Sequence, residues 1–253
     1  MNADALIAAL DLPASSRVDR RVPKKLLTEN AGPTAADRRR INEGIDEMLW
    51  LATLKPTTIG VAEYRDDARE YLEIPVLRLR LHATASAARL LELVHRAIPY
   101  PLLLVTEQGE RCSLSAAHKR WSLGEAGKTV LEGDVVATDW AVQHDDAGWW
   151  PTFCDALSVG KQPGDTLRAL YQAWIDTLLA LQAARVTGVF AAAASAEHAA
   201  QRRDALQECA QLDAKMARLR AAAAKAKQIS HRVEINLELK RVEAAHVAAC
   251  ARL

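Results

Sequence analysis

The distribution of glycine and proline most constrains how this chain can fold. All eleven glycines lie at or before Gly188, and the last proline is Pro163. Between Ala191 and Ala226, 16 of the 36 residues are alanine, which has the highest helix propensity. Because no residue after Gly188 interrupts a helix, the sequence predicts that residues 189–253 form a separate helical segment.

Apolar residues recur at alternating steps of four and three along this segment. Eleven of the thirteen positions in this series, which runs from Ala205 to Val247, are apolar, as in the seam of a coiled coil. A continuous helix from about Ser195 would be roughly 85 Å long at ~1.5 Å per residue. The seam is thinnest at residues 223–230, where a helical hairpin could turn back instead. The large seam residues are the expected partner or oligomer interface: Leu212, Met216, Leu219, Val233 and Leu237.

Residues 1–188 show mixed periodicity, which predicts an α+β domain. Helices are expected over residues 3–10, 34–54, 87–97 and 166–184, the second one because Thr34 and Asp37 form a capping box before an apolar stripe. Strands are expected over residues 57–61, 72–81, 102–106, 111–121 and 129–140. The prediction is a mixed or antiparallel sheet of four to five strands with flanking helices, followed by the long C-terminal helix or hairpin.

Composition and spacing argue against several classes of protein. The chain has 33 Lys and Arg against 32 Asp and Glu, so it is not a globally basic nucleic-acid binder. No run of 18 apolar residues and no signal peptide is present, so we expect a cytoplasmic protein without membrane contact. The four cysteines lack CxxC or CxH spacing, and no two histidines stand two or four residues apart. We therefore expect no metal site and no cofactor.

Two patterns resemble catalytic motifs without completing them. Residues 122–129 are one glycine short of a phosphate-binding loop, and a β-branched run follows where such a loop needs a helix. A metal-dependent nuclease would need convergent carboxylates, for which Glu107, Glu110, Asp134 and Asp139 are the candidates. Neither pattern identifies catalytic residues, so we name none.

Local charge separation is the more informative feature. Residues 17–40 hold eight basic residues against three acidic ones, and residues 43–73 hold eight acidic residues against three basic ones. Such separation can contact phosphate or a partner, or it can form a solvated face with intramolecular ion pairs. Lys119, Arg120 and Trp121 add two cations and an aromatic ring at a strand end. The nucleic-acid-binding candidates are Arg20, Arg21, Lys24, Lys25, Lys55, Lys119 and Arg120.

Several stretches of the chain resemble a known family. They are Lys24–Glu29, Leu54–Val61, Tyr71–Leu77, Ala97–Val105 and Leu114–Arg120. Together they resemble an uncharacterised bacterial domain family whose genes lie beside helicases and DNA methyltransferases in restriction and phage-defence loci. The resemblance covers roughly residues 1–185 and, more loosely, the tail. It implies a biological setting and carries over no catalytic residues.

The sequence thus favours a non-enzymatic accessory subunit of a bacterial DNA-targeting complex of the restriction-like or anti-phage kind. Its α+β domain would contact nucleic acid or a partner, and its C-terminal helix would dock a helicase or DNA methyltransferase subunit. One alternative is a metal-dependent nuclease or other hydrolase with a degenerate motif. The other is a coiled-coil scaffold that associates with itself.

Overall fold

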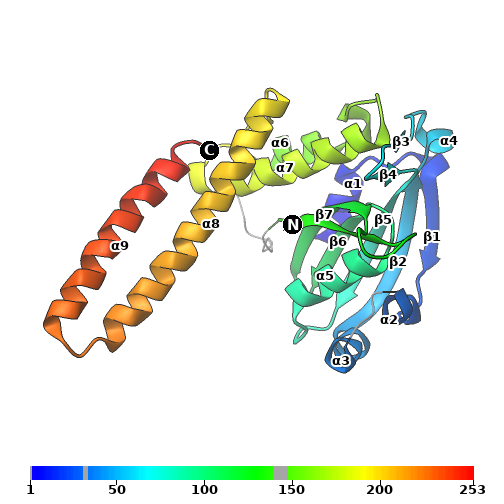
Figure 1. Ribbon diagram of the computed structural model, residues 1–253. Coiled ribbons are helices and arrows are strands. Elements are labelled where there is room, and N and C mark those ends of the chain that lie inside the picture. The colour runs from blue at the N-terminus through cyan, green and yellow to red at the C-terminus, as the bar shows by residue number, and fades with distance from the viewer. Residues whose placement is uncertain (1, 31–33, 139–147) are drawn as a thin grey trace. The chain divides into compact units, whose positions relative to one another are not determined.

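The computed structural model describes residues 2–30, 34–138 and 148–253. The chain divides into two compact units, Met1–Leu178 and Leu179–Leu253. The first is an α+β unit built on a sheet, and the second contains two long helices (Figure 1). Among the described residues, no helix is both long enough and apolar enough to cross a lipid bilayer.

The α+β unit is organised around a mixed sheet of six strands, counted over the described residues. The strand order is β1-β2-β5-β6-β7-β8, and neighbouring strands are antiparallel except for the parallel pair β5 and β6. The sheet is larger than the four to five strands predicted, because β1 and β2 were not recognised as strands. The strands are β1 (Arg17–Arg21), β2 (Ile45–Leu54), β5 (Ile74–Leu81), β6 (Leu103–Gln108), β7 (Arg111–Trp121) and β8 (Thr129–Ala137), and β3 (Tyr64–Arg65) pairs with β4 (Glu70–Tyr71) in a separate ribbon.

Helices cover both faces of the sheet. On one face lies α5 (Ala87–Ala97), which connects the parallel strands and packs with α2 (Lys25–Asn30) and α3 (Ala35–Gly44). Leu77, Leu79 and Leu81 of β5 belong to this core. Arg78 points to the opposite face, as strand alternation requires, and there it pairs with Asp4 of α1 (Ala3–Ala9). On that face α1 contacts α6 (Trp150–Leu157), whose Leu157 carbonyl accepts a hydrogen bond from Trp174 of α7 (Leu167–Thr187).

The prediction of a helix up to Leu54 is wrong beyond Gly44. Thr34 caps α3 as expected, but Ile45–Leu54 forms β2, which is hydrogen-bonded to both β1 and β5. The register of β2 shifts twice, between Ile45 and Glu47 and between Trp50 and Ala52. Each bulge adds one residue to β2, so buried side chains such as Ile45 and Met48 fall three residues apart instead of two. Because of these bulges, the apolar residues of β2 have the spacing that is typical of a helix.

The predicted strand over residues 57–61 is also wrong, because Pro56–Ile59 is a short helix, α4. Pro56 occupies the first helical turn, where its missing N–H leaves no hydrogen bond unmade. The Lys55 N–H donates to Thr58 Oγ1, and Gly60 ends the turn at φ +72°. Local capping here outweighs the strand preference of two threonines and an isoleucine.

The C-terminal unit contains a helical hairpin and not one continuous helix. Helix α8 (Ala196–Lys225) ends at Ala226, and α9 (Ile229–Cys250) begins three residues later. The two helices pack antiparallel along their length (Figure 1). The turn falls within residues 223–230, where the apolar seam was thinnest.

Candidate functional site

Most of the predicted basic residues near β1 are already engaged within the α+β unit. Arg21 Nε lies 3.4 Å from Glu47, and Lys25 Nζ lies 3.3 Å from Glu29. The Lys24 ammonium donates to the carbonyl oxygens of Asn42 and Ile45. Arg20 is exposed on the edge strand β1. Charged side chains on an edge strand also hinder the pairing of that strand with other chains. The basic residues near β1 therefore have a structural role besides any role in binding a ligand.

Lys55 and Arg120 are likewise held by neighbours. Lys55 Nζ is 2.7 Å from Glu73, and Arg120 Nη1 donates to the Trp121 carbonyl at 3.0 Å. These contacts match the alternative in which charge separation produces a solvated face with intramolecular ion pairs. Such exposed pairs contribute little to stability, and a polyanion could displace them only by competing with the resident carboxylate.

Lys119 does not lie on the surface. Its side chain is buried, with 2% exposed, and its ammonium donates to the His95 carbonyl and, at 2.5 Å, to the Ile98 carbonyl. Both carbonyls belong to the C-terminal end of α5, where intrahelical donors are lacking and a cation is favoured. Burial lowers the pKa of Lys119 to about 7. In this position Lys119 caps a helix and is not available to a phosphate.

The fold also separates the two predicted basic groups. Strands β1 and β7 are four steps apart in the sheet, about 19 Å at ~4.8 Å per step. The basic face that would have joined Arg20–Lys25 to Lys119–Arg120 is therefore not continuous through these residues. Nucleic acid could therefore contact either the basic residues near β1 or Arg120 on β7. Lys119 is buried and does not connect these two places on the surface.

His95 lies beside Lys119 and is fully buried. Its Nε2 is 3.0 Å from Ser115 Oγ, while Nδ1 has no hydrogen-bond partner in the described part of the chain. Burial, and secondarily the charge on Lys119, lowers the pKa of His95 to about 3. This histidine and serine are enclosed by the core between α5 and β7, and we assign them a structural role.

Stability should therefore fall on mild acidification. Between pH 6.5 and about 3, His95 binds a proton in the unfolded chain but not in the folded one, so unfolding becomes easier as pH decreases. Its contribution to the slope approaches about 1.4 kcal/mol per pH unit. We expect urea unfolding at pH 6.5, 5.5 and 4.5 to show this loss, with a shallower slope in His95→Gln. Equal slopes in the two proteins would contradict it.

Among the described residues, the candidate carboxylates do not assemble a metal centre around Glu107. Its carboxylate is held by Arg78 at 2.8 Å and by Arg80 at 2.6 Å, and these two arginines lower its pKa against the effect of burial. Glu110 and Asp134 are exposed, at the β6–β7 turn and on β8. Asp139 lies outside the described residues.

The loop at residues 122–129 lacks the geometry of a phosphate-binding loop. It joins β7 to β8, so a strand and not a helix follows Lys128. Lys128 forms an ion pair with Glu125 in the same loop. We expect Lys128→Ala to leave calorimetric titration with ATP unchanged, because wild-type protein should show no saturable binding either. Saturable binding that this substitution removes would contradict the assignment.

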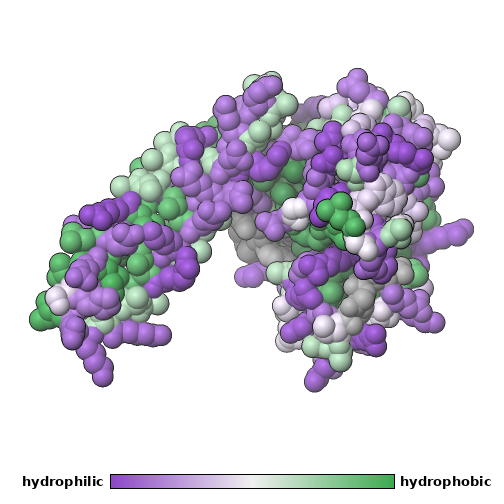
Figure 2. All heavy atoms as spheres, in the orientation of Figure 1, coloured by the Kyte–Doolittle hydropathy of each residue, from purple (hydrophilic) through white to green (hydrophobic). Residues whose placement is uncertain are grey.

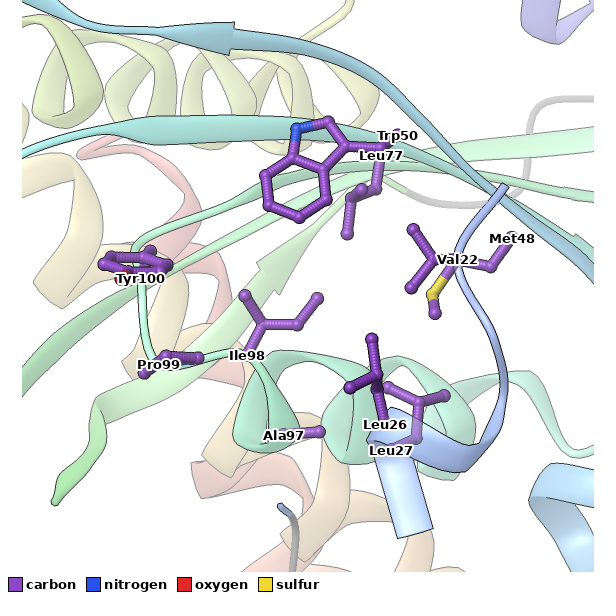
Figure 3. Close-up of a pocket in the computed structure, with 10 residues that line it drawn as sticks. All are labelled: Val22, Leu26, Leu27, Met48, Trp50, Leu77, Ala97, Ile98, Pro99 and Tyr100. Carbon is purple, nitrogen blue, oxygen red and sulfur yellow. The ribbon is translucent and has the colours of Figure 1, made fainter. Parts of the chain in front are cut away.

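A small apolar cavity of about 120 Å³ lies between α2, strands β2 and β5, and the C-terminal end of α5 (Figure 3). Trp50, Leu77, Ile98 and Leu26 are among its lining residues, and the Trp50 Nε1 is already bonded to Ala52 and Thr53. The cavity is smaller than the several hundred Å³ of a cofactor pocket. It could hold one apolar side chain.

The predicted interface residues divide between two environments in the hairpin. On α8, Met216 is buried and Leu212 and Leu219 are half-buried. On α9, Val233 and Leu237 are 51% and 55% exposed, because the buried face of α9 is formed by Ile235, Val242 and Ala249. The sequence pattern predicted that the seam residues of both helices form one interface. In the structure, the turn between the helices places Val233 and Leu237 on the face of α9 that points away from α8.

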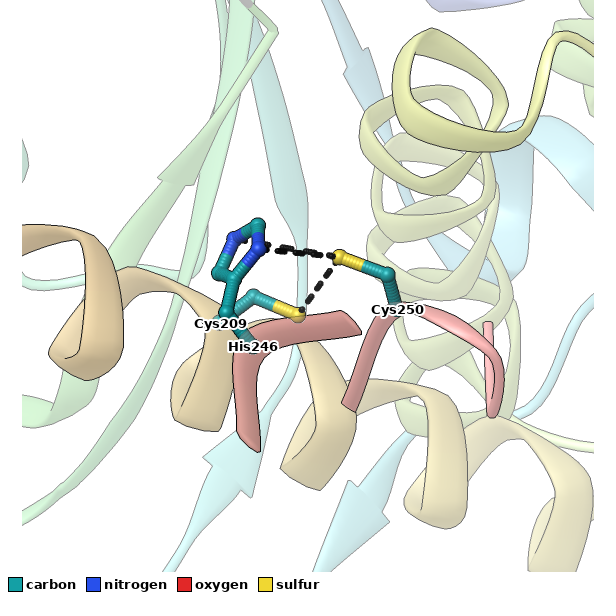
Figure 4. Close-up of side chains that lie close together, drawn as sticks. All are labelled: Cys209, His246 and Cys250. Atoms are coloured by element: carbon teal, nitrogen blue, oxygen red, sulfur yellow. Dashed lines mark hydrogen bonds between the residues drawn. The ribbon is translucent and has the colours of Figure 1, made fainter. Parts of the chain in front are cut away.

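The hairpin also brings together three side chains that could hold a metal. Cys209 of α8 and His246 and Cys250 of α9 each offer a ligand atom, and these atoms lie within 4.8 Å of one another (Figure 4). The expectation of no metal site considered only cysteine motifs and pairs of histidines. The signal that was overlooked combines different residue types. Cys209 is four residues from Asp213, and His246 is four residues from Cys250.

Comparison with known proteins gives one match. The model of the family described as "Domain of unknown function (DUF4391)" matches residues 10–245. Neither the curated proteins nor the solved structures contain a significant match to the chain.

Proposed function

This chain belongs to the DUF4391 family, and from that premise and the surface of its hairpin we propose that it is a non-enzymatic accessory subunit that docks a partner protein through α9. The partner we propose is a helicase or DNA methyltransferase subunit of a bacterial DNA-targeting complex. That class of partner rests on the resemblance of the chain's motifs to a family found in restriction and phage-defence loci.

The observation that carries the docking proposal is a row of exposed apolar side chains on α9. Val233, Leu237, Ala244 and Val247 follow one another at steps of four, seven and three residues, with Lys240 in the gap, and Val247 is 69% exposed. The opposite face of α9 already packs in the hairpin. Figure 2 shows hydrophobic residues interrupting the hydrophilic surface along the hairpin. An exposed apolar row at heptad spacing fits an interacting helix better than it fits solvent.

Lys240 favours a different protein over a second copy of this chain as the docking partner of α9. It is the central position of the row, so pairing α9 with itself, parallel or antiparallel about this centre, places two lysine ammonium groups together. A partner helix with an acidic side chain opposite Lys240 would form an ion pair instead. The row therefore favours a heterologous partner over the self-associating scaffold.

Nucleic-acid contact is a secondary part of the proposal and is confined to β1. Arg17 and Arg20 are exposed on this edge strand, and within the described chain neither has a carboxylate partner. Few phosphate contacts are possible there, so binding by the isolated protein should be weak and strongly dependent on salt. The other predicted cations form ion pairs (Arg21, Lys25 and Lys55), donate to backbone carbonyls (Lys24 and Arg120) or are buried (Lys119).

The proposal is tested by coexpressing the untagged chain with the tagged products of its neighbouring genes, among which the proposal expects a helicase or DNA methyltransferase subunit. We expect a stable complex of defined stoichiometry with one of them by affinity capture, gel filtration and light scattering. A chain that remains free of these products, or that forms a dimer alone with the same apolar row buried, would contradict it.

A further inference from the structure

A cluster of cysteine and histidine lies at the end of the hairpin where the C-terminus of α9 meets α8. Cys209 is buried on α8, and His246 and Cys250 are half-buried one helical turn apart on α9. Residues four apart on a helix share a face, so α9 directs both side chains at Cys209. The arrangement depends on the hairpin, since 41 residues separate the two cysteines in sequence.

Two of the three separations between ligand atoms are close to the edges of a tetrahedron around one metal ion, and the third, from Cys209 to His246, is at most 4.8 Å. The two Sγ atoms are 3.5 Å apart, and Cys250 Sγ is 3.7 Å from His246 Nδ1 (Figure 4). With zinc–sulfur bonds of ~2.3 Å and zinc–nitrogen bonds of ~2.0–2.1 Å, tetrahedral angles give edges of about 3.8 Å and 3.6 Å. A metal could therefore enter without a large movement of either helix.

A carboxylate orients the histidine from the other side. Asp213 lies one turn after Cys209 on α8, and its Oδ1 is 3.2 Å from His246 Nε2. Histidine ligands commonly donate their second ring N–H to a carboxylate, which fixes the tautomer and ring orientation. Nδ1 and Nε2 lie 3.7 and 3.8 Å from Cys250 Sγ, so with Nε2 engaged by Asp213 it is Nδ1 that would bind the metal.

We propose that Cys209, His246 and Cys250 form a zinc-binding site in which Asp213 positions His246 and water completes the tetrahedron. Two thiolates and one imidazole select a thiophilic ion that accepts tetrahedral geometry, and they disfavour magnesium and calcium, which prefer oxygen ligands. The site goes beyond the proposed docking function and does not depend on any partner. His246 and Cys250 also lie past residue 245, where the family match ends.

Zinc must displace protons to bind here. Burial, followed by the hydrogen bond with Cys250, raises the pKa of the Cys209 thiol to about 11 in the metal-free state. Because the ligands bind as thiolates, zinc affinity should weaken as pH falls and binding should release protons.

The zinc site would add to the stability that packing gives the hairpin. Ala199, Ala205 and Ala249 are buried along α8 and α9 but contribute little apolar area, whereas Met216, Ile235 and Val242 contribute more. A metal held by both helices adds its binding free energy to folding of the hairpin. It also closes the end of the hairpin opposite its turn.

The test uses the untagged full-length protein, purified in a non-thiol reductant. We expect about one zinc per chain by elemental analysis, and after removal of zinc we expect cobalt to give thiolate charge-transfer and tetrahedral visible bands. Cys209→Ser and His246→Ala should abolish these bands, and Asp213→Asn should weaken metal affinity about 10–100-fold. The matched controls are Cys154→Ser, a cysteine of α6, and His231→Ala, an exposed histidine of α9, which should both retain the bands.

Two outcomes would overturn the proposal. One is the absence of bound zinc and of cobalt bands in reduced protein that circular dichroism shows to be helical. The other is a Cys209–Cys250 disulfide in the protein as isolated, with no metal bound after reduction. Partner capture is measured separately, so failure of the metal site and failure of the docking proposal remain distinguishable.

Discussion

Replacing Lys119 with alanine should destabilise the α+β unit by about 3–5 kcal/mol. The substitution removes a long buried side chain and leaves a cavity, which alone costs a few kcal/mol in a core. It also leaves the His95 and Ile98 carbonyls at the end of α5 without their donor. Thermal and urea unfolding, together with hydrogen exchange of the α5 amides, would measure the loss.

Arg120→Ala is the matched control, because Arg120 is the next residue on β7 and, within the described residues, its side chain donates only to the Trp121 carbonyl. We expect it to change the free energy of unfolding by less than about 1 kcal/mol. If Lys119 instead served as a surface phosphate contact, its replacement would spare stability and reduce DNA binding. A Lys119→Ala protein as stable as wild type would therefore contradict the helix-capping role.

The lowered pKa of Lys119 adds a distinct pH signature. Between pH 7 and about 10.5 the unfolded chain holds a proton on this lysine that the folded chain has released. Stability from this group consequently rises with pH across that window. The neutral amine still has two N–H groups, so capping of α5 persists on the alkaline side.

The parts of the fold that could be predicted from sequence are those that local periodicity determines. Helix α5 and strand β7 have the predicted boundaries, because one has an apolar stripe of helical period and the other lies between turn residues. Strand β2 was mistaken for a helix because its bulges are a property of pairing with β5, which periodicity within one segment does not contain. Lys119 was mistaken for a surface cation because its acceptors are backbone carbonyls 21 and 24 residues away.

The candidate sites depend still more on tertiary structure. The seam on α8 was recognised, but the turn at residues 226–228 decides that Val233 and Leu237 face outward while Ile235 and Val242 pack. The proposed zinc ligands become one cluster only because the same turn pairs α8 with α9 in one register. The local spacing was present in the sequence: His246 and Cys250 are four residues apart, and so are Cys209 and the carboxylate Asp213.

Replacing Val233 and Leu237 together with glutamate should abolish the partner complex and leave the hairpin folded. Both side chains are more than half exposed, so the charges remain in water in the free protein and cost it little. In a helix–helix interface the same two carboxylates would be buried without counterions, which weakens binding by several kcal/mol, or more than a hundredfold. Affinity capture and calorimetry with the coexpressed partner measure the loss, and circular dichroism measures helix content.

Arg232→Glu provides the matched control, since it changes the net charge by the same two units at an exposed position about 100° around α9 from Val233, outside the apolar row. It should leave capture intact. Glutamate at Leu212 and Leu219 is a different experiment: these side chains are half-buried on α8, so the charges should open the hairpin itself and lower helix content. Partner binding that survives the Val233 and Leu237 replacements, with the control unchanged, would remove α9 as the docking surface, whatever the metal content of the hairpin.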